Sequence, residues 1–311
     1  MQPQLLPQGS SLLLAVSGGQ DSMALLTLLQ DLAPMHGWSL NLWHGDHRWH
    51  DGSSRIAAEL SRWCQQRQLR LQVDQAAPGQ VPSEAKARQW RYERLAQQGR
   101  DAGADVVTGH TASDRAETML LQLARGSDLA GLAALPSVRP LSPKGPQLRR
   151  PLLHLQREDT LQICRDLALP IWEDPSNQSP DFARNRIRQE VLPVLEGLHP
   201  GSTKRMSDLA ERVSQVRDSQ TELSQMALKL LQTPSGLDRR GLGALSPATR
   251  RLLLAQWLQQ QRVPALSASQ LDKLSQRLEN GAPGGAADLA GGWQLSWKGG
   301  ELVLQQREAE H

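Results

Sequence analysis

The pattern of hydrophobic and polar positions over the first 125 residues alternates short, continuous apolar runs with segments of helical periodicity. The apolar runs fall at 11–16, 39–44, 69–73 and 105–108. Helical segments follow them at 23–29, 53–67, 82–98 and 113–125. Continuous apolar strands that alternate with helices are typical of βαβ units and of a parallel sheet covered on both faces. The sequence therefore predicts an α/β fold with a doubly wound parallel sheet.

The later part of the chain breaks this rhythm. Residues 136–150 and 170–180 are rich in proline and predict loops. From about residue 204 the chain is mainly helical, with helix starts at Ser246-Pro247 and Ser267. Two alternating segments, 293–297 and 301–304, predict a hairpin. We expect a catalytic domain over residues 1–205 and a smaller, mainly helical domain over 206–311.

Composition narrows the class of protein. Two cysteines among 311 residues exclude a disulfide framework and any cluster held by cysteines alone. No apolar stretch approaches the ~20 residues of a membrane span, and the N-terminus lacks a secretory pattern, so we expect a cytoplasmic protein with no membrane partner. The net charge is +3 and most of the basic residues are arginine, which suits phosphate and RNA, although a GC-rich genome explains the same bias.

The strongest local signal is the turn between the first strand and the first helix. Its residues are Ser17, Gly18, Gly19, Gln20, Asp21 and Ser22. Paired glycines before a helix N-terminus form a cradle of N–H groups for phosphate. A carboxylate repels phosphate, and a Mg²⁺ ion between the two resolves the conflict at Asp21. The alternative is an ordinary strand–turn–helix in which Asp21 only favours the helix start.

A second signal follows the fourth strand. Asp114 and Glu117 lie three residues apart in the first turn of a helix, at the carboxyl edge of the predicted sheet where such folds bind ligands. We expect them to converge with Asp21, for Mg²⁺ ligation or for binding and deprotonating an amine. The alternative is that acids merely favour first turns through the helix dipole. The nearby His44, His47 and His110 are expected to be neutral, hydrogen-bonded or core residues rather than metal ligands.

These motifs resemble those of the N-type ATP pyrophosphatases, whose phosphate loop has the pattern SGGxDS. Within that superfamily the chain is most similar to the tRNA(Ile)-lysidine synthases. The shared motifs are Asp46-His47, the segment 84–92, Thr108-Gly109-His110 with 114–118, the segment 125–132, 150–153, 173–177 and 184–188. The resemblance covers residues 11–193 motif by motif and continues more loosely to Gly291-Gly292-Trp293.

The resemblance implies a definite reaction. ATP adenylates C2 of the wobble cytidine in the CAU anticodon of isoleucine tRNA, with release of pyrophosphate. Free lysine then displaces AMP to give lysidine. By this resemblance Ser17–Ser22 bind ATP and Asp21 and Asp114 bind Mg²⁺. Asp114 and Glu117 meet lysine or the metal, and Arg184 and Arg188 bind phosphate. The fold implied is that of the adenine nucleotide alpha hydrolases.

Some positions depart from the family pattern, and alternatives remain. Ser113 stands where the family often has Asp, Asp128 where it often has Gly, and Arg48-Trp49-His50 follows His47 where it often has Gly-Leu-Arg. A related tRNA thiolase is one alternative, although it needs paired cysteines to carry sulfur. A non-catalytic RNA-binding relative is another. The C-terminal domain is expected to dock tRNA through backbone phosphates. The basic residues proposed for this are Arg239-Arg240, Arg250-Arg251 and those between 139 and 157.

Overall fold

The computed structural model describes residues 5–48, 52–77, 79–81, 83–172, 179 and 181–306. The motif at 173–177 lies outside the described residues. The chain forms two compact units, Met1–Gln215 and Val216–His311. The long helix α9 (Ser202–Leu231) contributes residues to both units, and the expected domain boundary near residue 205 falls inside it. In the described part of the chain, every helix is too short or too polar to cross a membrane.

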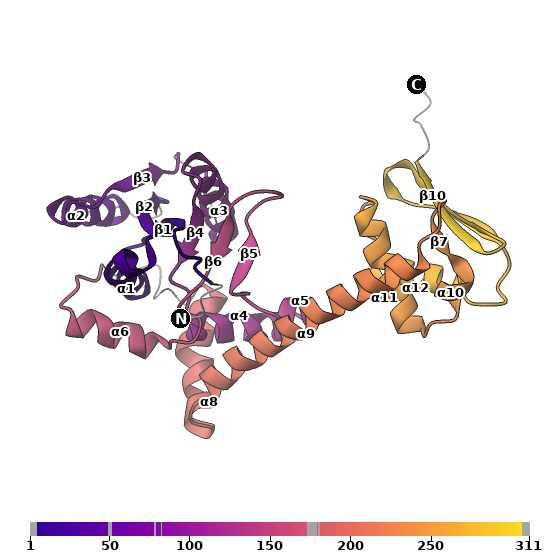
Figure 1. The fold of residues 1–311 in the computed structure, drawn as a ribbon. Helices are drawn as coiled ribbons and strands as arrows, with labels where there is room; N and C mark the ends of the chain where they lie inside the picture. The colour runs from indigo at the N-terminus through magenta and orange to yellow at the C-terminus, as the bar shows by residue number, and fades with distance from the viewer. Residues whose placement is uncertain are drawn as a thin grey trace. The chain divides into compact units, whose positions relative to one another are not determined.

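Unit 1 is built on a six-stranded sheet (Figure 1). Its strands are β1 (Ser11–Ala15), β2 (Ser39–Asp46), β3 (Leu71–Gln75), β4 (Asp105–Thr108), β5 (Val138–Pro140) and β6 (Gln147–Arg149). Their order is β3-β2-β1-β4-β6-β5, and only β5 runs antiparallel to its neighbour. The predicted parallel, doubly wound sheet is therefore confirmed. The prediction of a loop over 136–150 is wrong, because β5 and β6 form there.

Helices cover both faces of this sheet. They are α1 (Gln20–His36), α2 (Gly52–Gln66) and α6 (Arg157–Asp166) on one face and α3 (Glu84–Asp101) on the other. Leu12 and Leu14 of β1 pack against α1, α2 and α6 in the core on one face of the sheet. Leu13, between them, packs with residues of α3 in the core on the other face. Successive residues of a strand point to opposite faces, so a strand covered on both sides is apolar throughout. This explains the unbroken apolar run at the start of the chain.

The remaining helices of unit 1 come after β4 in the sequence. They are α4 (Ala112–Ala124), α5 (Leu129–Leu132), α7 (Ala183–Arg186), the π-helical turn η2 (Ile187–Val191), α8 (Leu192–Leu198) and the first part of α9. Met119 of α4 packs in a small cluster with Ala134 and Ala210 of α9. This cluster fixes α4, whose first turn carries Asp114.

Unit 2 combines short helices with a four-stranded antiparallel sheet. Its elements are α10 (Arg239–Gly243), α11 (Pro247–Gln260), α12 (Ala268–Arg277), the short turn η3 (Ala290–Gly292), β7 (Leu237–Asp238), β8 (Gly285–Asp288), β9 (Trp293–Lys298) and β10 (Glu301–Gln306). The strand order is β7-β10-β9-β8, and the predicted hairpin is β9–β10. The expected helix starts are confirmed, since the Ser246 and Ser267 side chains cap α11 and α12.

Two arginines expected on the tRNA-facing surface of unit 2 are instead internal. Arg250 is 2% exposed, and its guanidinium donates to the carbonyls of Ser275, Gly243 and Leu245. Arg239 is also buried and donates to the Ala282 carbonyl. The Nη groups of these arginines satisfy carbonyl groups at helix ends and in loops. The prediction that Arg239 and Arg250 contact RNA phosphates is therefore wrong.

Candidate active site

A cleft opens in unit 1 at the carboxyl ends of β1, β2 and β4. It encloses a cavity of about 340 Å³. Its lining includes the turn after β1, the first turn of α4, and residues from α3, α6 and α7. Chain connections lead in opposite directions from β1 and β4, which makes their shared edge the switch point where open α/β sheets bind ligands.

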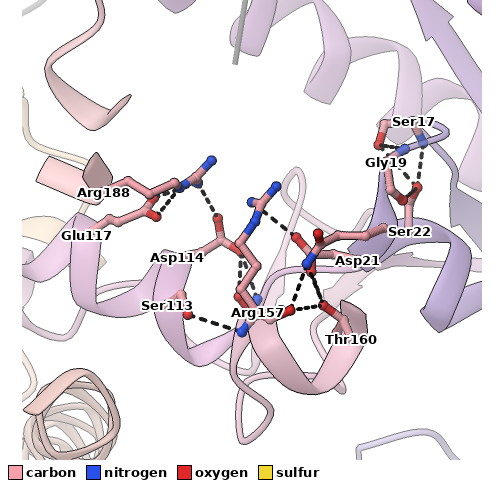
Figure 2. Close-up of polar contacts among 12 residues, drawn as sticks. Ser17, Gly19, Asp21, Ser22, Ser113, Asp114, Glu117, Arg157, Thr160 and Arg188 are labelled. Carbon is pink, nitrogen blue, oxygen red and sulfur yellow. Dashed lines mark hydrogen bonds and ion pairs between the residues drawn. The ribbon is translucent and has the colours of Figure 1, made fainter. Parts of the chain in front are cut away.

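The turn after β1 is held closed by one hydroxyl group. Ser22 Oγ accepts hydrogen bonds from the backbone N–H groups of Ser17 and Gly18, each at 3.1 Å (Figure 2). The same hydroxyl donates to the Gly19 carbonyl at 2.9 Å. The N–H groups of Gln20 and Asp21, in the first turn of α1, have no hydrogen-bond partner among the described residues. They are donors for an anion at a positive helix end.

Two glycines permit the close approach of backbone at this turn. Gly18 has φ +88°, a left-handed conformation that favours glycine, and a Cβ there would lie 3.2 Å from the Trp172 ring. A Cβ on Gly109, at the end of β4, would lie 2.8 Å from the carbonyl oxygen of Asp21. Any side chain at Gly109 would push α4 away from α1. These glycines therefore bring the turn after β1 and the first turn of α4 together.

Asp21 is anchored by helix α6. Thr160, which is fully buried, donates its hydroxyl to Asp21 Oδ1, and Arg157 Nη1 lies 3.5 Å from Oδ2 (Figure 2). The Gln20 amide donates to Thr160 Oγ1 at 3.1 Å and to the Arg157 carbonyl at 2.7 Å, and this carbonyl is also a second acceptor for the Thr160 hydroxyl, at 2.9 Å. Burial, and next the negative charge of Asp114, raise the pKa of Asp21.

Asp114 lies across the cleft from Asp21. Its Oδ2 accepts from the Thr111 N–H at 2.8 Å in a capping box, and its Oδ1 accepts from Arg184 at 3.1 Å. Burial opposes ionisation of this carboxyl group, but the charge of Arg184, the Thr111 hydrogen bond and the charge of Arg188 outweigh it. Together they lower the pKa of Asp114 to about 2. The group is an anion at neutral pH, and it also serves the helix start.

Glu117 is buried against Arg184 and Arg188 and does not line the cleft. It is completely buried, and its two oxygens accept from Arg184 Nε at 2.7 Å and from Arg188 Nε at 2.6 Å and Nη2 at 2.9 Å. Both arginines line the cleft, whereas Glu117 does not. The π-helical turn η2 begins between the two arginines and keeps positions four apart on one side. The three expected acids thus gather at one place, but only Asp21 and Asp114 face the cavity.

The described histidines and cysteines are not grouped as metal ligands. Among the described residues, no group of three or more His, Cys, Asp or Glu side chains is arranged to hold a metal ion. Burial lowers the pKa of His44 and, far more, that of His110, so both are neutral, as the sequence predicts. Cys64 and Cys164 are buried outside the cleft lining, and burial raises the pKa of Cys64 to about 11. Neither is a reactive thiol.

Sequence reasoning missed three residues of this site. Thr160 and Trp172 carried no recognisable signal, because each contacts the turn from more than 130 positions away in the chain. Arg157 was expected among tRNA-contacting residues of a loop, but it begins α6 and pairs with Asp21 in the cleft. These residues come close to the turn after β1 only in the folded chain, so the sequence alone does not identify them.

The comparisons with known proteins agree with this geometry. The sequence model of the PP-loop domain matches residues 2–195, and that of the TilS substrate binding domain matches residues 237–308. The chain is 66% identical over 312 residues to tRNA(Ile)-lysidine synthase of Parasynechococcus marenigrum, covering 99% of this chain and 93% of that protein. The chain belongs to the tRNA(Ile)-lysidine synthase family. Another member, from Prochlorococcus marinus strain SARG, is 44% identical and covers 96% of this chain and 91% of its own.

Among solved structures, the U34-tRNA thiolase NcsA from Methanococcus maripaludis with its 4Fe-4S cluster has the same fold. The TM-score is 0.58 at 17% identity, over 68% of this chain and 73% of that one. The PP-loop match identifies the turn after β1 as part of an ATP-binding domain. In this member of the lysidine synthase family, the turn after β1 and Asp114 therefore line one cleft.

Proposed function

We propose that this chain is an ATP-dependent ligase that joins lysine to C2 of the wobble cytidine in the CAU anticodon of isoleucine tRNA. The observation that carries the proposal is family membership over the full length of the chain, in a protein whose phosphate turn and paired carboxylates line one cleft. The cytidine O2 attacks the α-phosphorus of ATP, and pyrophosphate leaves. The ε-amine of lysine then attacks C2, loses a proton, and AMP leaves as lysidine forms.

The turn after β1 is proposed to hold the triphosphate. The Gln20 and Asp21 N–H groups supply donors, and Ser17 and Ser22 supply hydroxyl groups. For the Ser17 and Gly18 N–H groups to join them, the Ser22 hydroxyl must turn away from the loop. Fixed donors at the α1 end favour the negative charge that develops as pyrophosphate leaves. Arg184 and Arg188, held by Glu117, are proposed to bind phosphate on the opposite wall.

The donor set around Asp21 fits a Mg²⁺ ion shared with ATP. Asp21 and Asp114 repel each other across the cleft, and a cation between them relieves this repulsion. Asp114 already accepts hydrogen bonds at both oxygens, so Asp21 and the phosphate oxygens are the principal ligands we expect. Mg²⁺ commonly binds through one or two carboxylates together with phosphates and water, and when bound it would withdraw charge from the α-phosphate.

Asp114 is proposed to receive lysine. It is the ionised carboxylate on the cleft wall, and an ammonium group is its natural partner. A carboxylate with a pKa of about 2 is a weak base, so Asp114 binds and orients the amine more effectively than it deprotonates it. Glu117, which two arginines occupy, is proposed to act by positioning Arg184 and Arg188.

The buried cysteines weigh against a thiolase. A sulfur-transferring enzyme needs a thiol or a cluster at the reacting base, and neither Cys64 nor Cys164 lines the cleft. Unit 2 is proposed to dock tRNA, in keeping with the substrate-binding domain that it matches. We expect the reaction to take place in the cytoplasm, where tRNA, ATP and lysine are available.

The test is incubation of the full chain with an isoleucine tRNA transcript bearing CAU, together with ATP, Mg²⁺ and labelled lysine. We expect stable label in the RNA at the wobble cytidine, and no label when any single component is omitted. A transcript with a GAU anticodon is the matched control, because it offers no wobble cytidine. Label in both transcripts, or in neither, would reject the proposed reaction.

A further inference from the structure

A cluster of arginines around one tyrosine borders the cleft, apart from the turn after β1. Its centre is Tyr92 on α3, whose ring has the Arg88 guanidinium 5.2 Å and the Arg139 guanidinium 4.8 Å from its centroid. Arg88 lies one helical turn before Tyr92, and Arg139 comes from the edge strand β5. Arg88 and Tyr92 also line the cleft. Residues from two distant segments thus present stacked cations at its rim.

A third cation lies next to this stack. Arg150 is 1% exposed, donates to the Pro136 carbonyl at 2.6 Å and is hydrogen-bonded to Tyr92. Its Nε is buried without a hydrogen-bond partner among the described residues. Burying a guanidinium is costly unless its charge and its donors find partners. Arg150 therefore adds a buried positive charge beside the Tyr92 ring.

The three guanidiniums bring their positive charges together around one phenol ring. Among the described side chains, no carboxylate forms an ion pair with Arg88, Arg139 or Arg150. Burial raises the pKa of Tyr92, but the three arginines outweigh it and lower that pKa overall. Burial and the charges of Arg139 and Arg88 lower the pKa of Arg150 to about 10, against the pull of Tyr92. Both shifts indicate a positive potential that an anion would relieve.

The position of the site identifies the anion. The sheet order places β6 and β5 beyond β4, whereas the phosphate turn follows β1, and α3 packs on the face opposite α1. A base that is to be modified must leave its stack and enter the cleft, while the backbone on either side stays at the rim. Guanidinium groups suit phosphodiester oxygens, which they bind through two parallel N–H groups.

We propose that Arg88, Tyr92, Arg139 and Arg150 form a subsite for an RNA phosphate next to the target nucleotide. The inference rests on the proposed function and specifies how its RNA substrate is held. Stacking on Tyr92 restrains the Arg88 and Arg139 side chains before the phosphate binds. This restraint lowers the conformational entropy that they lose on binding. Arg139 comes from an edge strand and is half-buried, so it can be changed without opening the core.

The experiment compares Arg139→Ala, Arg139→Lys and the control Arg67→Ala. Arg67 is likewise an arginine stacked on an aromatic ring, at 4.2 Å from the Trp63 centroid, but it is exposed and lies just before β3, at the opposite edge of the sheet. We measure tRNA affinity over a range of salt concentrations, and separately the affinity for ATP without tRNA. Arg139→Ala should weaken tRNA binding about tenfold. It should also reduce the slope of log K against log salt by about 0.7 to 1.

Arg139→Lys keeps the charge and should restore most of the slope, while Arg67→Ala should match the wild type. The subsite is refuted if Arg139→Ala behaves as Arg67→Ala does, or if Arg139→Lys is as weak as Arg139→Ala. An equal loss of ATP affinity would assign these residues to the nucleotide instead. If the wild type makes no lysidine yet Arg139→Ala still loses tRNA affinity and salt slope, the proposed reaction fails and the phosphate subsite stands.

Discussion

Glu117 offers the sharpest test of how the cleft wall is held. The change is Glu117→Gln, which keeps the shape and removes the charge. Glu117 is fully buried and accepts three hydrogen bonds from Arg184 and Arg188, at 2.7, 2.6 and 2.9 Å. The glutamine amide would turn its NH₂ group toward one of these guanidiniums, where two donors then face each other.

The magnitude follows from these contacts. Removing one partner of a buried ion pair typically costs about 3–5 kcal/mol, because the remaining charge is buried alone. Arg184 and Arg188 keep Asp114 as a second partner, at 3.1 and 3.5 Å, so we expect the lower end, about 3 kcal/mol. ATP–pyrophosphate exchange in the presence of tRNA should fall more steeply than the folded fraction does, since both arginines lose their fixed position.

The assay is urea unfolding followed by tryptophan fluorescence, with exchange measured on the same samples. The matched control is Glu190→Gln, which removes an exposed partner of Arg186 from the adjoining helical turn. We expect that control to leave the free energy of unfolding unchanged, because exposed ion pairs contribute little. If Glu117→Gln unfolds at the same urea concentration as Glu190→Gln, Glu117 does not hold the arginines and the reasoning is refuted.

Four further predictions concern Thr160, Asp114 and Arg250. Thr160→Val should slow ATP–pyrophosphate exchange about tenfold by releasing Asp21, and Thr160→Ser should restore it; equal rates for both variants would contradict the positioning role. Asp114→Asn should raise the lysine concentration needed for half-maximal rate more than it weakens tRNA binding. The pKa of Asp114 is lowered to about 2 in the folded protein, so its ionised form stabilises the fold above pH ~4. This stabilisation is lost as the pH falls through about 2. In urea titrations, the free energy of unfolding of Asp114→Asn should not show this loss. Arg250→Met should destabilise unit 2 by about 3 kcal/mol in thermal unfolding, whereas the exposed Arg251→Met should not.

The sequence was informative where local pattern decides structure. The apolar runs, the glycine pair and the acids three residues apart predict β1, the turn after it and the first turn of α4. Each of these depends on neighbours within a few positions. The same applies to the caps of α11 and α12, where one serine accepts from the N–H three residues later.

The sequence did not predict contacts between segments that lie far apart in the chain. Arg184 reaches Glu117 across 67 positions and Thr160 reaches Asp21 across 139, and no local pattern encodes such pairings. Arg250 looks like a surface residue in the sequence because arginine usually is one, yet helix ends packed around it make it internal. Prolines concealed β5, because Pro140 is tolerated on a strand that pairs on one side only.

The most direct test of the central claim follows the α-phosphate of ATP. The full chain is incubated with the CAU transcript, Mg²⁺ and ATP labelled at the α-phosphate, without lysine, and the RNA is then isolated. The account predicts label on the RNA that is released as free AMP when lysine is added, and no label with Asp21→Ala. Label that instead appears on lysine, with no need for RNA, would show that the amino acid is the group activated and would contradict the account.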